Sequence, residues 1–169
     1  MYYMEEIVAD SSTIILLAKT TLLRMIATEK KIVITSMVKT EVLEKKEQDD
    51  AKIIFRLIQE ELVTEHKEKM EYQKMSDDFG IGAGESEMLA LAYKEKKKVA
   101  TDDWRAIKAC KVLDIKFITA IHCLIYLAKI KKLDVKMAKV KLKNLEKYGR
   151  YNSEIIKDAR NIIEGEKNG

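Results

Sequence analysis

Two short stretches, Glu-Ile-Val-Ala-Asp at residues 6–10 and Lys-Val-Ala-Thr-Asp-Asp at residues 98–103, decide the fold of this chain. In each stretch, an apolar run suited to a buried strand ends at an acidic residue, and a helical apolar pattern begins directly afterwards. Further strand-like runs occur at residues 31–35, 62–65 and 116–119, separated by helical patterns. Strands that alternate with helices predict an α/β fold whose central sheet has about five strands and is mostly parallel.

The helical patterns between and after these strands are expected to form helices, to within about 2–4 residues at each end. They cover about 12–19, 21–29, 36–47, 49–61, 68–76, 84–96, 103–112, 120–131, 134–147 and 153–164.

The length of 169 residues and the hydrophobic fraction of 47% fit one domain over residues 1–169, with a core at about 5–120 and a basic helical extension at about 120–165. No run of about 20 apolar residues occurs, and the amino terminus lacks the pattern of a secretory signal, so we do not expect a membrane protein. Cys110 and Cys123 lie among helical apolar neighbours, without the spacing of metal ligands or of a disulfide framework. Buried thiols in a reducing compartment, the cytoplasm, are therefore expected.

Five acidic residues lie at or near the edges of the apolar runs, namely Asp10, Glu41, Glu85, Asp102 and Asp103. Because parallel strands bring their carboxyl ends to one edge of a sheet, where α/β proteins bind ligands, these residues are candidates for a common site. Clustered carboxylates raise one another's pKa unless a cation neutralises them, and their hard oxygens suit Mg²⁺ or Mn²⁺. One or two such ions would activate water for attack on phosphorus, so the pattern predicts hydrolytic nuclease chemistry.

Each acidic residue also has an ordinary explanation. Asp10 is placed to cap the helix that follows it, and Glu41 precedes Lys45 by four residues, the spacing of a surface ion pair on a helix. Glu85 and Glu87 come directly after a glycine-rich segment at a helix start, where the backbone dipole favours carboxylates. Only the joint placement of the acidic residues favours a site.

A basic segment follows the last predicted strand. Between residues 129 and 150 nine basic residues face only two acidic ones, on a protein whose formal net charge is +4. Apolar residues recur there at helical spacing, so most lysines are expected to point outward, either into solvent or onto phosphate groups of RNA. The candidate RNA contacts are Lys136, Lys139 and Lys143, together with Arg105.

Two further features are open to more than one interpretation. The only tryptophan, Trp104, is expected to pack against the edge of the sheet, with stacking on a nucleobase as the alternative. The predicted early helices carry many apolar residues, which predicts exposed apolar faces and a homodimer; they are Ile14, Ile15, Leu17, Leu22, Leu23 and Ile26.

Four stretches in this order resemble the successive motifs of the PIN domain family. They are Val8-Ala9-Asp10-Ser11-Ser12, residues 35–42 ending in Thr40-Glu41-Val42, residues 84–92 beginning with Gly84-Glu85-Ser86-Glu87, and Ala100-Thr101-Asp102-Asp103. The resemblance covers residues 6–120, and the later helices are similar to those of a prokaryotic PIN-like subfamily. It implies a three-layer α/β/α sandwich and a ribonuclease that depends on Mg²⁺ or Mn²⁺.

The resemblance also implies a role for each motif residue. Asp10, Glu41, Glu85, Asp102 and Asp103 would be the catalytic acids, and all of these except Glu41 would bind metal. The hydroxyls of Ser12 and Thr101 would hold carboxylates in place by hydrogen bonds. Glu87 lies close enough to Glu85 to take its place as the third ligand.

The biological role has several alternatives. Many similar proteins are toxins paired with an antitoxin protein, whereas others process ribosomal RNA; the compact length favours the toxin, and Thr101-Asp102-Asp103-Trp104 resembles the processing enzymes. A non-catalytic module that binds RNA or protein through the basic helices is a second possibility, although all the acidic motif positions are filled. A phosphatase or receiver-like domain with Asp10 as nucleophile would leave Glu41 and Glu85 without a role.

Overall fold

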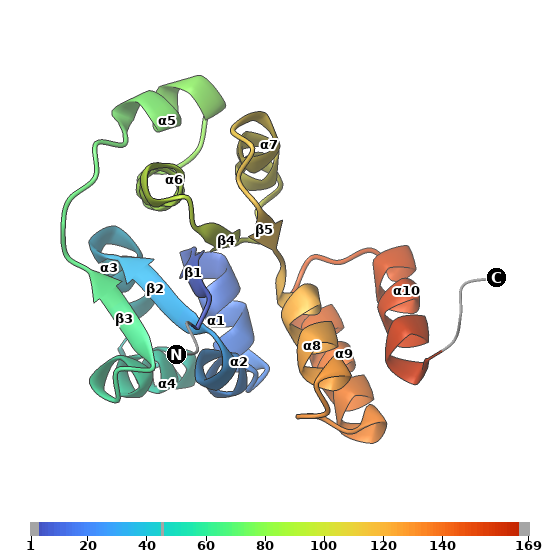
Figure 1. Cartoon of the computed structure of the whole chain (residues 1–169). Helices are drawn as coiled ribbons and strands as arrows, with labels where there is room; N and C mark the ends of the chain where they lie inside the picture. The colour runs from blue at the N-terminus through green and yellow to red at the C-terminus, as the bar shows by residue number, and fades with distance from the viewer. Residues whose placement is uncertain (1–3, 45, 166–169) are drawn as a thin grey trace.

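The computed structural model of the chain describes residues 4–44 and 46–165. Five strands form one sheet in which every neighbouring pair is parallel, in the order β3-β2-β1-β4-β5 (Figure 1). The strands are β1 (Glu6–Ala9), β2 (Lys31–Thr35), β3 (Val63–His66), β4 (Lys98–Ala100) and β5 (Phe117–Ile118). The parallel sheet predicted from the alternation of strands and helices is therefore confirmed.

Helices fill the intervals between the strands and continue after β5. They are α1 (Ser11–Lys19), α2 (Leu23–Glu29), α3 (Ser36–Leu43), α4 (Asp49–Gln59), α5 (Gln73–Phe79), α6 (Ala83–Glu95), α7 (Trp104–Val112), α8 (Ala120–Lys129), α9 (Val135–Tyr148) and α10 (Ser153–Glu164).

The sheet has an apolar core on each face, because successive side chains along a strand point to opposite sides. In β1, Ile7 and Ala9 face the helices α1 to α4 and α8 to α10, whereas Val8 faces α6 and α7. Figure 1 shows these two groups of helices on opposite sides of the strands. The fold is thus the three-layer α/β/α sandwich that the resemblance implied.

The last three helices belong to the larger core. The helices α8 and α9 pack against α1, and α8 also contacts α2, while α9 and α10 pack on each other. The early apolar residues are therefore covered within the chain: Ile14, Leu17, Leu22, Leu23 and Ile26 are all buried, and Ile15 is half-buried. The prediction of exposed apolar faces on these helices is wrong, and the argument for a homodimer that rested on them is lost.

One helix starts later than its sequence predicted. The expected helix at 68–76 is α5, from Gln73 to Phe79, because residues 67–69 are charged and exposed and offer no apolar side chain to the core. Its end is set by Gly80, which adopts φ 61° and donates its N–H to the carbonyl oxygen of Ser76 at 2.9 Å. Glycine adopts this left-handed conformation without the steric penalty of a side chain, so it commonly ends helices.

Both cysteine thiols are free and buried, as predicted. Burial raises the pKa of the Cys110 thiol to about 11. Over residues 4–44 and 46–165, no helix combines the length and the apolar character needed to cross a membrane.

Candidate active site

The candidate site lies where the direction of the sheet's connections changes. From the central strand β1 the chain moves outward to β2 and β3 on one side, and then returns to β4 and β5 on the other. Such a switch point leaves a crevice at the carboxyl ends of the two central strands, which is the usual ligand position in open α/β sheets. Here Asp10 and Thr101 are the first residues beyond β1 and β4, and the backbone N–H of Asp10 donates to the carbonyl oxygen of Ala100 at 3.1 Å.

Asp10 is a buried carboxylate whose two oxygens are both held by hydrogen bonds. Oδ1 accepts the backbone N–H of Thr13 at 2.8 Å, which caps α1, and also the hydroxyl of Ser12 at 3.2 Å. Oδ2 accepts the hydroxyl of Thr101. Burial raises the pKa of Asp10 from 3.8 to about 6, with a smaller contribution from the charge of Asp102, although the hydrogen bonds oppose this rise. Asp10 is both the helix cap and the central acid of the crevice.

Asp102 is joined to Asp10 through Thr13. The Thr13 hydroxyl donates to Oδ2 of Asp102 at 2.8 Å, while its backbone N–H donates to Asp10. Asp102 also accepts the backbone N–H of Ala120, at 3.2 Å to Oδ2, and the hydroxyl of Tyr151. These bonds bring Asp10 and Asp102 to one place, as predicted, and fix the direction of both carboxylates.

The neighbouring Asp103 caps a helix, a role that the sequence analysis did not give it. Its Oδ1 accepts the backbone N–H groups of Arg105 at 3.0 Å and Ala106 at 2.9 Å, so it caps α7. This cap holds the start of α7 directly beside Asp102.

Glu41 reaches from α3 to the beginning of α6. Its carboxylate accepts the hydroxyl of Ser11, and a Cβ added at Gly84 would lie 2.3 Å from its Oε1. Gly84 therefore makes room for this carboxylate. Glu85 turns back over the start of its own helix, since a Cβ added at Gly82 would lie 2.7 Å from its Oε2. Lys45, the proposed ion-pair partner of Glu41, lies outside the described residues.

Glu87 is directed away from Glu85. Its side chain is only 3% exposed, and its Oε1 lies 3.5 Å from the backbone nitrogen of Met37, near the start of α3. The two candidates for the third ligand thus occupy different surroundings: Glu85 lies over Gly82 at the start of α6, and Glu87 lies between α6 and α3.

The acidic residues do not all converge on one point. Over the described ranges 4–44 and 46–165, no three Asp, Glu, His or Cys side chains form a group that could hold one ion. Asp10 and Asp102 are nevertheless linked, and none of the ion pairs among the described residues includes either carboxylate. Two hard, oriented carboxylates without a basic partner fit a divalent cation such as Mg²⁺ or Mn²⁺.

Sequence reasoning missed two residues that organise this pair, Thr13 and Tyr151. Thr13 follows Asp10 by three residues, the position whose N–H a capping aspartate accepts, and this spacing could have found its backbone contact. Tyr151 lies between α9 and α10, 49 residues after Asp102. No local pattern connects two residues so far apart, so only the tertiary structure reveals this contact.

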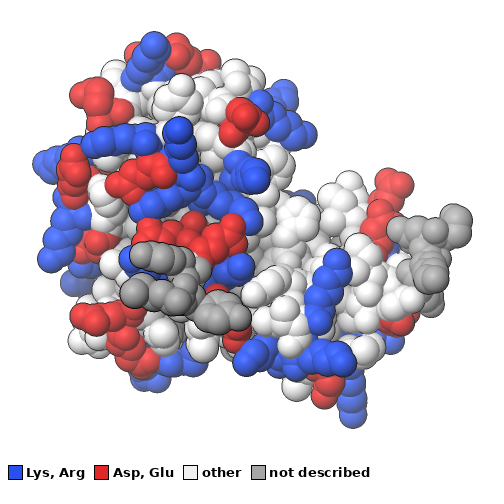
Figure 2. Space-filling view, in the orientation of Figure 1, with Lys and Arg blue, Asp and Glu red and all other residues white. Residues whose placement is uncertain are grey.

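The predicted RNA contacts lie in two separate places. Lys136, Lys139 and Lys143 are exposed on α9, where Lys139 forms an ion pair with Glu164 at 2.6 Å. Arg105 is exposed at the start of α7 and donates to the carbonyl oxygen of Gly80 at 3.3 Å. Figure 2 shows that basic and acidic residues are interspersed over the face in view.

Trp104 does not pack against the sheet. It is the first residue of α7 and is 58% exposed, because the buried face of this helix is formed by Ala106, Ala109 and Cys110. The prediction that it belongs to the core is wrong.

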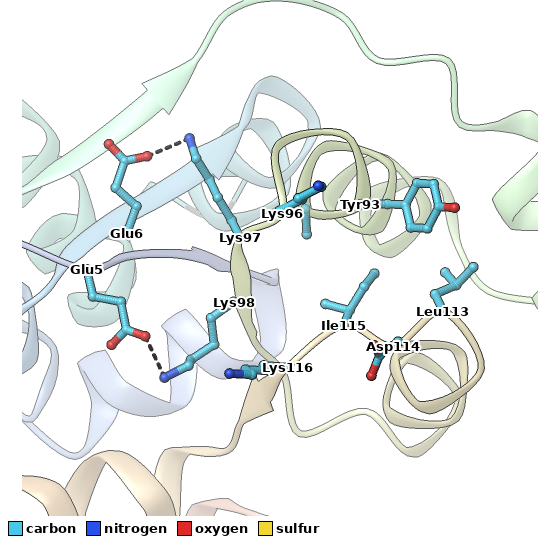
Figure 3. Close-up of a pocket in the computed structure, with 11 residues that line it drawn as sticks. Glu5, Glu6, Tyr93, Lys96, Lys97, Lys98, Leu113, Asp114, Ile115 and Lys116 are labelled. Carbon is cyan, nitrogen blue, oxygen red and sulfur yellow. Dashed lines mark ion pairs between the residues drawn. The ribbon is translucent and has the colours of Figure 1, made fainter.

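A cavity of about 790 Å³ lies at the opposite end of the sheet. It opens near the amino ends of β1, β4 and β5, and acidic residues line it together with lysines (Figure 3). Lys97 pairs with Glu6 at 2.5 Å and Lys98 with Glu5 at 2.6 Å. Because the chain neutralises both of these carboxylates itself, we interpret this cavity as the gap above an ion-pair network rather than as the active site.

The fold is that of a nuclease-type α/β domain. A comparison with protein families agrees with this, since the family model described as PIN domain matches residues 6–163. The chain belongs to the PIN domain family, whose members are generally nucleases. The search of curated proteins gave no match.

Proposed function

We propose that this protein is a metal-dependent ribonuclease that hydrolyses phosphodiester bonds of RNA in the crevice beyond β1 and β4. The observation that carries the proposal is the pair of carboxylates, Asp10 and Asp102, linked through Thr13 at the switch point of the sheet. Membership of a family of nucleases supports the same chemistry.

In this proposal Asp10 and Asp102 would hold Mg²⁺ or Mn²⁺, and Asp103 and Glu85 would become further ligands only when their side chains move toward the ion, since they form no group with the pair in the described residues. The bound ion would supply an activated water and stabilise the charge that develops on the phosphate. The hydroxyls of Thr101, Thr13 and Ser12 donate to the carboxylates and thereby hold their free lone pairs in a fixed direction. Glu41 accepts the hydroxyl of Ser11, the residue after Asp10, and its carboxylate lies beside Gly84. In this proposal it is a further acidic group of the site.

The biological role that we attach to this activity is that of a toxin paired with an antitoxin protein, because many of the proteins that the chain resembles are such toxins. Expression of the chain should then arrest bacterial growth, and the Asp10→Asn variant, expressed at the same level, should not. Growth arrest of equal strength by both proteins would contradict a toxic nuclease.

The proposed activity is tested by cleavage of a labelled pool of single-stranded RNA in Mg²⁺, Mn²⁺ or EDTA. Wild type should cut only with metal, and Asp10→Asn and Asp102→Asn should each lower the rate by more than about a hundredfold. Asn retains the size of Asp and an acceptor oxygen, so both variants should fold, which circular dichroism would verify. If wild type cuts no faster than these variants but binds RNA in a salt-sensitive way, a non-catalytic RNA-binding module is the better account.

A further inference from the structure

Trp104 is an exposed aromatic residue held at the edge of the candidate site. It follows Asp103, the cap of α7, and is two residues from Asp102, so its Cα lies within about 7 Å of the Asp102 Cα along the chain. More than half of its surface is accessible, at 58%. The position of Asp102 is fixed by Thr13, Ala120 and Tyr151, so the start of α7 and its tryptophan are placed on a rigid support.

Two basic side chains accompany the indole ring. Lys108, one turn further along α7, places its Nζ 4.4 Å from the ring centroid, and the guanidinium carbon of Arg105 lies at 5.5 Å. Arg105 is also tied to the carbonyl oxygen of Gly80, which holds it near the ring. An aromatic plane with cations beside it matches the two parts of a nucleotide, since bases stack on aromatic rings and phosphates attract basic groups.

We propose that Trp104, with Arg105 and Lys108, is the stacking site for an unpaired nucleobase next to the phosphate that the enzyme cuts. This inference rests on the proposed function, because it places a base of the substrate beside the acidic pair. Lys108 is long and flexible, so a base can displace its ammonium group from the ring while the adjoining phosphate accepts it.

A stacking site of this kind selects single-stranded RNA. Bases within a duplex are stacked on one another and their faces are not accessible, whereas an unpaired base can be splayed onto an aromatic side chain. The interaction tolerates any base, because every base has a π face. In this proposal Trp104, and not the lysines of α9, gives the enzyme a preference for unpaired RNA.

Tryptophan fluorescence, excited at a wavelength that the seven tyrosines do not absorb, reports on this site alone, because Trp104 is the only tryptophan in the chain. Wild type in EDTA, where no cleavage is expected, would be titrated with a single-stranded oligoribonucleotide, with the matching duplex and with inorganic polyphosphate. We expect strong quenching by the single strand and little by the duplex or by polyphosphate, which has charge but no bases. Binding of the single strand, seen by anisotropy of a labelled oligonucleotide, without a change in tryptophan fluorescence would overturn the proposal.

The affinities of variants for the same oligonucleotide distinguish base stacking from electrostatic attraction of the phosphates. Trp104→Ala should weaken binding about tenfold, whereas Trp104→Phe should retain most of it. Tyr93→Ala is the matched control, since Tyr93 is 56% exposed but borders the cavity at the opposite end of the sheet. Equal affinities for wild type and Trp104→Ala would also overturn the proposal.

These measurements are independent of catalysis, so the two proposals can fail separately. If Trp104→Ala cuts RNA with an unchanged KM while Asp10→Asn is inactive, the nuclease stands and the stacking site is wrong. If neither wild type nor any variant cuts RNA, but the single strand still quenches the fluorescence of Trp104, the nuclease proposal fails while the stacking of a base on this residue stands.

Discussion

At the amino ends of the central strands, Glu5 and Glu6 are surrounded by lysines of the same chain. Glu5 pairs with Lys30 at 2.9 Å as well as with Lys98, and hydrogen bonding to Lys98 lowers the pKa of its carboxyl group. At the carboxyl ends of the same strands, the donors to Asp10 and Asp102 among residues 4–44 and 46–165 are all neutral hydroxyl and backbone groups. Burial raises the pKa of Asp10 there, in contrast to the lowered pKa of Glu5.

The two ends contain the same chemical group in opposite electrostatic states. At one end the chain supplies the neutralising cations, and the result is a surface ion-pair network of the kind that contributes little to stability. At the other end the negative charge is buried and directed by hydrogen bonds but not neutralised. A carboxylate pair of this kind costs folding free energy and leaves coordination positions for a cation from solution.

The largest effect is expected when a basic side chain is introduced beside Asp10, at the carboxyl ends of the central strands. Ser12→Lys places an ammonium group within reach of Asp10, because the Ser12 hydroxyl already lies 3.2 Å from its Oδ1. We expect cleavage to fall by more than about a hundredfold because the lysine displaces the metal, while the melting temperature is maintained. Ser12→Ala is the control and should lower the rate only a few-fold. A Ser12→Lys protein that cuts RNA at the wild-type rate would contradict the idea that the carboxylate of Asp10 must stay free of basic partners to bind metal.

The next effect concerns the pH dependence of stability. Because folding raises the pKa of Asp10 from 3.8 to about 6, the folded state holds this proton more tightly than the unfolded state. The Asp10 contribution to the free energy of unfolding should therefore decrease by about 3 kcal/mol as the pH rises from about 4 to about 6, and stay constant above. Urea unfolding of wild type and Asp10→Asn at several pH values isolates this contribution, since the other groups titrate in both proteins.

Addition of Mg²⁺ provides a second test of the same carboxylate. Above pH 6 the ion should raise the melting temperature of wild type but not that of Asp10→Asn, because a ligand that binds only the folded state stabilises it. Equal shifts in both proteins would place the ion elsewhere.

A smaller effect is expected at Gly84, where α6 meets Glu41. The methyl group of Gly84→Ala would lie 2.3 Å from Oε1 of Glu41 and displace this carboxylate. Cleavage should fall about tenfold, while the melting temperature changes little, because the end of a flexible side chain can move and alanine favours a helix. An activity equal to that of wild type would show that Glu41 takes no part in cleavage.

The smallest effect is expected for Tyr151→Phe, which removes one donor from Asp102 and leaves the ring in place. The free energy of unfolding should decrease by about 1 kcal/mol, as is typical for the loss of one hydrogen bond. The cleavage rate should fall a few-fold with an unchanged KM, because Asp102 is held less firmly but RNA still binds. A change in KM alone would place Tyr151 in contact with RNA instead.

The sheet and the acidic pair could be predicted because their causes are local. The pattern of strand, acid and helix repeats at Asp10 and Asp102, and parallel strands bring such positions together. The core of the early helices could not be predicted in this way: Ile14 and Leu22 are buried, but their sequence does not show that helices more than a hundred residues later would cover them. The exposure of Trp104 was missed for a similar reason, since it depends on which side of α7 meets the sheet.

The acid at position 102 is also the point where the last three helices are fastened to the rest of the molecule. It binds the first N–H of α8 and the hydroxyl of Tyr151 before α10. These helices are thus not an exchangeable module: a hybrid carrying the carboxyl-terminal part of another protein would lose the Tyr151 bond, and would keep the bond from α8 only if the first N–H of that helix lay in the same place. Any partner that shifts α8 or Tyr151 would in the same way alter the candidate active site without touching it.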